Sequence, residues 1–408
     1  MILYIRLAWR NILRNKKRTI IAGVAIGMGL ASLIFYDSIV IGMKESMVRT
    51  ATSSFIGQAQ IHGEGFRETH EVELTVVDLG GVIDGLDKSG IVKNYSPRVM
   101  SFGMISSAGN SSQIAVYGVD PEKEKHLSKI DEAIFTGDYF SGESKRDVVL
   151  GSKLAEQLEV GLEDRIVITL AQAETGDLSQ DMFRVSGIYK FGDRNLDGGM
   201  AFIRLHMAQE MLNIPGEVHE IAIEFTDIKY AENDTLDFWS HFSEYGNDAV
   251  SWTTLFPQLK GAFDMSETAK GIIGFILFAV VALGIINTML MSIHERIFEF
   301  GVLKAIGTAP GRIFILIIFE AVLLSLVSIV IGSIIALALG IILGHTGIDY
   351  RGMEFLGTTV QELMYPVLTV DQFIVYPIWV LILTTFVGLY PAAHAARINP
   401  SDAMRKSL

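Results

Sequence analysis

The chain has 408 residues, of which 50% are hydrophobic and 19% are charged. This composition is too apolar for a soluble protein and too charged for one that lies wholly in the membrane, so we expect spanning helices together with a soluble domain. The formal net charge is −13 and there are no cysteines, which excludes disulfides and thiolate metal sites.

The N-terminal segment, residues 1–19, carries six basic residues and no acidic one. Four of them recur at helical spacing and form one basic stripe: Arg6, Arg10, Arg14 and Lys17. We therefore predict an amphipathic helix that lies on the cytoplasmic membrane surface before the first span. A cleavable signal peptide is the alternative, because Gly29-Leu30-Ala31 offers small residues at a cleavage position.

Four segments are apolar enough to span a membrane as helices. They are residues 20–42, 268–293, 313–344 and 373–393. Lysine and arginine are concentrated in residues 1–19, in the connection 294–312 and in the tail 394–408. By the positive-inside rule both termini and this connection are predicted to be cytoplasmic, and the loop 345–372 faces the opposite side.

The long insertion between the first two spans, residues 43–267, is predicted to form an extracytoplasmic α+β domain. Strands are expected at 147–151, 165–170 and 183–189, and helices at 153–158 and 206–212. Residues 43–55 and 255–270 are compatible with helix and are predicted to continue the first two spans as a stalk. The insertion holds 37 acids and 19 bases, so we expect no binding of nucleic acid.

The connection between the second and third spans, residues 294–312, is a short charged segment between two apolar runs. Its apolar residues recur at helical spacing, which predicts a short amphipathic helix. Gly307 and Pro310 are expected to end that helix and turn the chain back into the membrane. The alternative is an ordinary solvated turn with an Arg296–Glu299 ion pair, worth only a few tenths of a kcal/mol.

This connection resembles a signature of the ABC-transporter permeases of the FtsX/MacB/lipoprotein-releasing superfamily. The matching positions are Glu295, Arg296, Glu299, Gly301, Leu303, Lys304, Ala305 and Gly307. The resemblance implies a coupling helix that sits in a groove of a cytoplasmic ATPase. Phe300 and Leu303 are then expected to be buried in the partner's groove, where they position Glu299 and Lys304.

The resemblance extends to both ends of the chain. The opening matches at Arg10, Asn11, Ile12, Arg14, Asn15, Lys16, Arg18 and Thr19, and the end matches at Pro391, Ala392, Ala395, Ala396, Arg397, Pro400, Ala403 and Arg405. Within the insertion, segments such as 118–122 and 148–151 look most like the lipoprotein-releasing permeases, which pass lipoproteins toward a periplasmic carrier. Residues 171–180 depart from that pattern, because the carrier-binding member has a longer hairpin there.

The sequence lacks the common motifs for nucleotide binding and catalysis. No G-x-x-x-x-G-K-S/T is present, so we expect no cofactor on this chain and ATP bound by a separate subunit. No metal site and no catalytic residue are predicted, and His219-Glu220 is interpreted as a surface or packing pair. Asp37 is expected near the outer end of the first span, so Glu320 is the one acid deep inside a predicted span. We interpret it as a structural pairing residue rather than a substrate contact.

These observations predict a permease subunit of a mechanotransmission-type ABC transporter in the bacterial inner membrane. Its expected partners are a cytoplasmic ATPase dimer and a second permease subunit, identical or paralogous. A lipoprotein substrate and a periplasmic carrier are implied by the resemblance. The alternatives are an FtsX-like actuator of a cell-wall hydrolase, MacB-like efflux of drugs or peptides, and a membrane-anchored ectoenzyme.

Overall fold

The computed structural model describes residues 2–14, 16–140, 145–192, 194–351, 354–355, 358–359 and 363–399. The chain divides into two compact units. One comprises Met1–Glu45, Phe263–Asp349 and Leu363–Leu408, and the other comprises Ser46–Ala262 and Tyr350–Glu362. An α+β domain is therefore inserted between the first and second spanning helices, as predicted.

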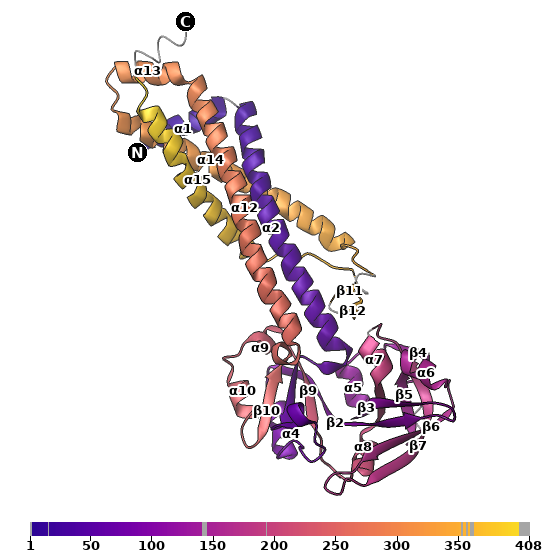
Figure 1. The fold of residues 1–408 in the computed structure, drawn as a ribbon. Coiled ribbons are helices and arrows are strands. Elements are labelled where there is room, and N and C mark those ends of the chain that lie inside the picture. Colours follow the sequence, from indigo (N-terminus) through magenta and orange to yellow (C-terminus); the bar gives the residue numbers. More distant parts are fainter. Residues whose placement is uncertain are drawn as a thin grey trace. The chain divides into compact units, whose positions relative to one another are not determined.

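The first unit is helical. Its elements are α1 (Ile2–Arg14), most of α2 (Lys16–Ala51), most of α12 (Pro257–Glu295), α13 (Ile297–Ala305), α14 (Pro310–Thr346) and α15 (Gln372–Ala396) (Figure 1). Helices α2, α12, α14 and α15 are long and apolar enough to cross a membrane, which confirms the four predicted spanning helices. At 1.5 Å per residue, even the shortest of them, the 25-residue α15, exceeds the roughly 30 Å of a hydrocarbon core.

Small residues let α2 and α14 approach each other closely. A Cβ atom added at Gly27 would lie 2.9 Å from the carbonyl oxygen of Ser328 and 3.0 Å from the backbone nitrogen of Gly332. In lipid, helix association depends on such close packing because burial of apolar surface gives little advantage there. A continuous buried core that includes Leu30 and Ile317 fills the space between the helices.

The second unit is organised around one ten-stranded sheet with the order β10-β1-β9-β2-β3-β8-β5-β7-β4, to which β6 adds by pairing with β2 and β7. The strands are β1 (Ala59–Gly63), β2 (Val92–Ser106), β3 (Ser111–Val119), β4 (Ile134–Gly137), β5 (Asp147–Gly151), β6 (Arg165–Ala171), β7 (Leu178–Tyr189), β8 (Met200–Arg204), β9 (Glu220–Phe225) and β10 (Asn247–Ser251). The β3–β8 and β5–β7 pairs are parallel, and the other pairs are antiparallel. A separate pair, β11 (Glu354–Phe355) and β12 (Thr358–Thr359), also belongs to this unit.

Short helices join these strands. They are the π-helical turn η1 (Thr52–Ile56), α3 (Phe66–Thr69), α4 (Leu79–Lys88), α5 (Pro121–Leu127), α6 (Ser152–Leu158), α7 (Arg194–Gly199), α8 (Leu205–Leu212), α9 (Lys229–Glu232), α10 (Asp237–Phe242) and α11 (Trp252–Leu255). The strands predicted at 147–151, 165–170 and 183–189 are confirmed as β5, β6 and the second half of β7. The helices predicted at 153–158 and 206–212 are confirmed as α6 and α8.

Candidate functional site

The connection between α12 and α14 is a short helix set off by breaks at both ends. Arg296 interrupts the helical path with φ −111° and ψ 16°, so that α13 starts as a separate helix at Ile297. After α13, Gly307 has φ +99°, a conformation that is unfavourable for residues with a Cβ atom. Its backbone N–H donates to the carbonyl of Lys304 at 3.0 Å, and Pro310 then opens α14 at a position where proline is favoured. The short helix predicted in this connection is confirmed.

Phe300 does not point outward, so the prediction that it is buried in a partner's groove was wrong. For Leu303 the same expectation stays a prediction. Phe300 is only 1% exposed and belongs to the core of the helical unit, against which the half-buried Leu303 packs. The exposed apolar residues of the connection are Phe298 at 47%, Val302 at 37% and Ile306 at 74%. The helix is apolar on two faces, and helical spacing alone could not tell which face the chain covers itself. The four-residue spacing from Phe298 to Ile306 was the missed signal.

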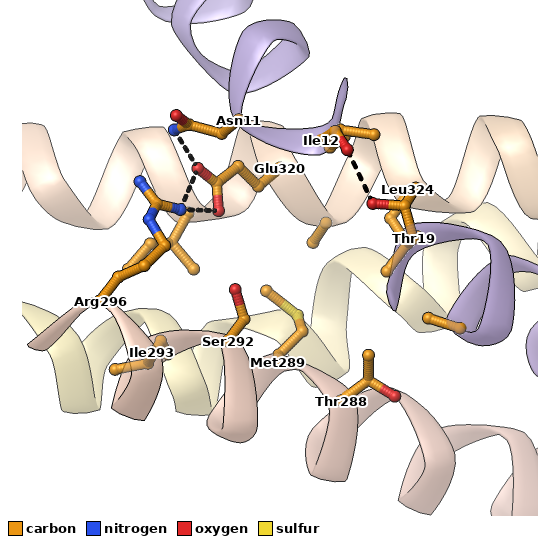
Figure 2. A pocket seen from close by; sticks show the side chains of 13 residues that line it. Asn11, Ile12, Thr19, Thr288, Met289, Ser292, Ile293, Arg296, Glu320 and Leu324 are labelled. Atoms are coloured by element: carbon orange, nitrogen blue, oxygen red, sulfur yellow. Dashed lines mark hydrogen bonds and ion pairs between the residues drawn. The ribbon is translucent and has the colours of Figure 1, made fainter. Parts of the chain in front are cut away.

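A charged network joins the connection to the spanning helices (Figure 2). The Arg296 guanidinium donates through Nη1 to Glu320 Oε1 at 2.8 Å and Oε2 at 3.0 Å, and through Nε to Glu299 Oε2 at 3.1 Å. Asn11 Nδ2 of α1 donates to Glu320 Oε1 at 2.6 Å, and Arg14 Nη2 donates to Glu299 Oε1. Glu320 is thus paired within the chain, and its interpretation as a structural rather than a substrate-contacting residue stays a prediction.

The charges of this network stabilise one another. Burial disfavours a charged Arg296, but the carboxylates of Glu320 and Glu299 outweigh this effect and raise the pKa of the guanidinium. For Glu299, burial alone would raise the pKa of the carboxyl group, but the hydrogen bonds from Arg14 and Arg296 outweigh this effect and lower it. The Arg296 guanidinium carbon also lies 5.0 Å from the centre of the Phe300 ring, within range of a cation–π interaction. At physiological pH the network is therefore fully ionised at Arg296 and Glu299.

Lys304 also binds within the chain. Its Nζ donates to the carbonyl oxygens of Ala396 at 2.9 Å and Ile398 at 2.7 Å. The last carbonyls of a helix have no partner inside that helix, so this lysine satisfies the end of α15. Of the other residues predicted for ATPase contact, Gly301 is buried, whereas Glu295 and Gly307 are exposed. Some of the residues predicted to contact the ATPase are thus buried or bonded within the chain, and others are exposed.

The basic N-terminal stripe lies on two helices rather than one. Arg6, Arg10 and Arg14 belong to α1 and Lys17 belongs to α2, and all four are exposed. Thr19 Oγ1 donates to the Ile12 carbonyl at 2.8 Å, whereas residues seven apart on one helix are separated by roughly 10 Å. The chain must therefore bend between them. Asn15, like Pro400, Ala403 and Arg405 of the closing motif, lies outside the described residues.

A buried charge cluster lies in the α+β domain. Arg98 of β2 is completely buried and donates to Glu124 Oε1 at 2.6 Å, to Glu220 Oε1 at 2.9 Å and to the Phe55 carbonyl at 2.5 Å. Burial disfavours charge on Arg98, but the two carboxylates raise its pKa. His219, beside Glu220, is also completely buried, so the packing interpretation of that pair is confirmed. The cluster joins β2, β9, α5 and η1 and leaves no carboxylate open to a substrate.

Comparison with known proteins adds family information. The FtsX-like permease C-terminal family matches residues 271–400, and the MacB-like periplasmic core domain family matches residues 19–235. The chain is 22% identical over 417 residues to the lipoprotein-releasing system transmembrane protein LolE of Haemophilus influenzae, covering 98% of both chains. It is 23% identical over 305 residues to the corresponding LolC of Xylella fastidiosa, covering 71% of this chain and 72% of the relative.

Other relatives carry a different name. The macrolide export ATP-binding/permease protein MacB of Neisseria meningitidis serogroup A is 23% identical over 429 residues, covering 98% of this chain and 60% of the relative. Among solved structures, the periplasmic region of MacB from Actinobacillus actinomycetemcomitans is similar with 13% identity and a TM-score of 0.35. That match covers 50% of this chain and 94% of that one.

Proposed function

Because the chain belongs to the FtsX/MacB family of ABC-transporter permeases, we propose that it transmits motion between a separate ATPase subunit and its α+β domain. The observation that carries this proposal is the exposed apolar stripe that Phe298 and Val302 of α13 form with Ile306 at its C-cap, and that a partner could cover. The opposite face of α13 is fixed to α14 and α1 through the Arg296 network. A push on α13 is therefore passed to the spanning helices.

The proposed orientation places both termini and α13 in the cytoplasm. The basic residues of α1 and Arg312 beside α13 support this orientation, because lysine and arginine favour the cytoplasmic side of the inner membrane. The ATPase, proposed to act as a dimer, then meets α13 directly. Two copies of the permease, or this chain and a paralogue, would match the two ATPase subunits.

The proposed transport substrate is a lipoprotein that is released from the inner membrane. The relatives named for lipoprotein release support this choice, since one of them aligns over 98% of both chains. MacB-like efflux is the second candidate, because MacB also aligns with 98% of this chain. Pulse-chase labelling of lipoproteins in spheroplasts depleted of the chain separates the two candidates. If the chain releases lipoproteins, newly made lipoproteins should be retained in the depleted spheroplasts. Unchanged release would instead favour MacB-like efflux.

The docking proposal is tested at Ile306, the C-cap residue of α13, which is 74% exposed. Ile306→Asp places a charge in the proposed apolar contact, and loss of a contact at the centre of an interface weakens binding by about thirtyfold. The tagged full chain should then purify from its host without an ATP-binding-cassette subunit. Phe135→Asp, at a 72% exposed site on β4, is the matched control and should retain the ATPase. Equal amounts of ATPase with both variants would refute the docking face.

A further inference from the structure

Helices α2 and α12 run antiparallel in the helical unit and contact each other along one seam. Asp37 Oδ1 of α2 lies 3.0 Å from Lys270 Nζ of α12. Lys44, seven residues after Asp37, places its ammonium 6.0 Å from the centre of the Phe263 ring, and Phe263 lies seven residues before Lys270. Seven residues make about two helical turns, so both contacts lie on the same face of each helix. Together they define the register between the two helices.

Asp37 also holds a third helix. Its side chain is buried within the spanning helix α2, where ionisable residues are rare and mark functional positions. Its Oδ2 accepts from Gln372 Nε2 of α15 at 2.9 Å, and Gln372 is itself only 2% exposed. A buried carboxylate depends on such partners, because without them it is an uncompensated charge. One side chain of α2 is therefore bonded to both α12 and α15.

The segment before α15 is fixed to α2 through the backbone as well. The Val367 N–H donates to the Ser38 carbonyl at 2.9 Å. At Gly42, an added Cβ atom would lie only 2.1 Å from the Tyr365 carbonyl oxygen. Such close backbone packing leaves no room for α2 to slide along this segment. The start of α15 and the middle of α2 thus form one rigid support for Asp37.

The bond from Asp37 to α12 can open more easily. The Lys270 side chain is 28% exposed and also pairs with Glu267 at 3.0 Å, three residues earlier on the same helix. Lysine carries a compact charge on a flexible stem, which suits an exchangeable contact. Lys270 can therefore leave Asp37 and remain paired with Glu267, while Asp37 keeps its hydrogen bond from Gln372.

We propose that Asp37 is a positioning residue that sets the register of α12 against α2 and α15, with Lys270 as its releasable partner. A slide of α12 by one helical turn, about 5.4 Å, would take Lys270 away from the buried carboxylate. The ion pair therefore selects one register of the seam, because a buried charge without its partner is unfavourable.

This register has a consequence for the transmission of motion. Helix α12 connects α13 to the α+β domain, and α2 enters that domain from the other end of the insertion. While the ion pair is closed, a displacement of α12 is shared with α2 and α15. Once Lys270 is released, the displacement is confined to α12. This consequence rests on the proposed function, whereas the register can be measured without an ATPase.

The test measures cross-linking between α2 and α12 in the purified full chain, without ATPase. Ile41→Cys and Ser266→Cys introduce thiols on the seam between the two contacts, and the chain has no cysteine of its own. A short bis-maleimide should link this pair efficiently. Asp37→Ala and Lys270→Gln should each lower the yield severalfold. Glu267→Gln should raise the yield, because it removes the partner that competes with Asp37 for Lys270.

The matched control is Asp264→Asn, which removes an exposed acid of α12 beside the seam and should leave the yield unchanged. Exchange of the two charges in Asp37→Lys with Lys270→Asp should restore cross-linking, which a general loss of stability would not allow. Size-exclusion chromatography checks each variant, and Lys270→Gln, at a partly exposed site, tests the register even if Asp37→Ala fails to fold.

Unchanged cross-linking in a folded Lys270→Gln variant overturns the proposal. A folded charge-exchange variant that does not regain cross-linking overturns it as well. Because no ATPase is present, either result leaves the proposed docking of α13 to be judged by its own experiment.

Discussion

Replacing Phe300 by alanine should destabilise the permease itself, before any partner is bound. The ring is 1% exposed and packs with Ile293, Ile313 and Ile317 in the core of the helical unit. Truncating a buried phenylalanine costs about 3–5 kcal/mol through lost packing and the cavity that remains. The neighbouring Arg296 also loses its cation–π partner, which adds about 0.5–2 kcal/mol.

Thermal unfolding of the purified chain in one detergent, without ATPase, measures this effect. The matched control is Phe298→Ala on the same helix, which removes the same atoms from a ring that is 47% exposed. The midpoint of Phe300→Ala should fall well below the wild-type value, whereas that of Phe298→Ala should stay close to it. Equal midpoints for the two variants would show that α13 does not pack as described here.

Three further outcomes are expected. Glu320→Leu should cost up to about 3 kcal/mol, because the Arg296 charge then keeps only its ion pair with Glu299. Arg296→Met with Glu320→Leu should cost less than the sum of the single changes, and additive shifts in thermal unfolding would contradict the pairing. Burial lowers the pKa of His62 from 6.5 to about 4. The unfolded domain therefore binds a proton at His62 at a higher pH than the folded domain does, and the free energy of unfolding falls by up to about 3 kcal/mol as the pH drops from about 6.5 to about 4. Urea unfolding of residues 46–262 should show this loss, and His62→Leu should reduce it but not remove it, because burial also lowers the pKa of His219. An identical pH dependence in both proteins would exclude His62. For topology, a membrane-impermeant maleimide should label Ser111→Cys in intact spheroplasts and Ala305→Cys only after lysis; the reverse pattern would invert the proposed orientation.

The fold was predictable where one physical signal dominates. Apolar length alone identified the four spanning helices, and alternating apolar residues identified strands such as β5. The order of the sheet strands was not predictable, because β1 pairs with β9 and β10 from the far end of the insertion. Local sequence patterns carry no information about such distant partners.

The candidate site was predictable in its position but not in its orientation. The charges and the glycine of residues 294–312 located the short helix, whereas Phe300 and Phe298 are chemically identical and only tertiary packing distinguishes them. The role of Asn11 could not be foreseen either. Its contact with Glu320 depends on the bend between α1 and α2, which places two distant segments in hydrogen-bonding distance. Helical periodicity continued through that bend and predicted one stripe.

The position of β1 in the sheet has a consequence for biogenesis. β1 follows directly after the first span, yet it lies between β9 and β10, which precede the second span. This edge of the sheet cannot close until the chain has been translocated through Ser251, and Arg98 lacks one of its two carboxylates until Glu220 has crossed. Until β9 and β10 have been translocated, β1 is unpaired and exposed, and exposed unpaired strands are prone to aggregate. Synthesis that pauses within the insertion should therefore require a chaperone on the far side of the membrane.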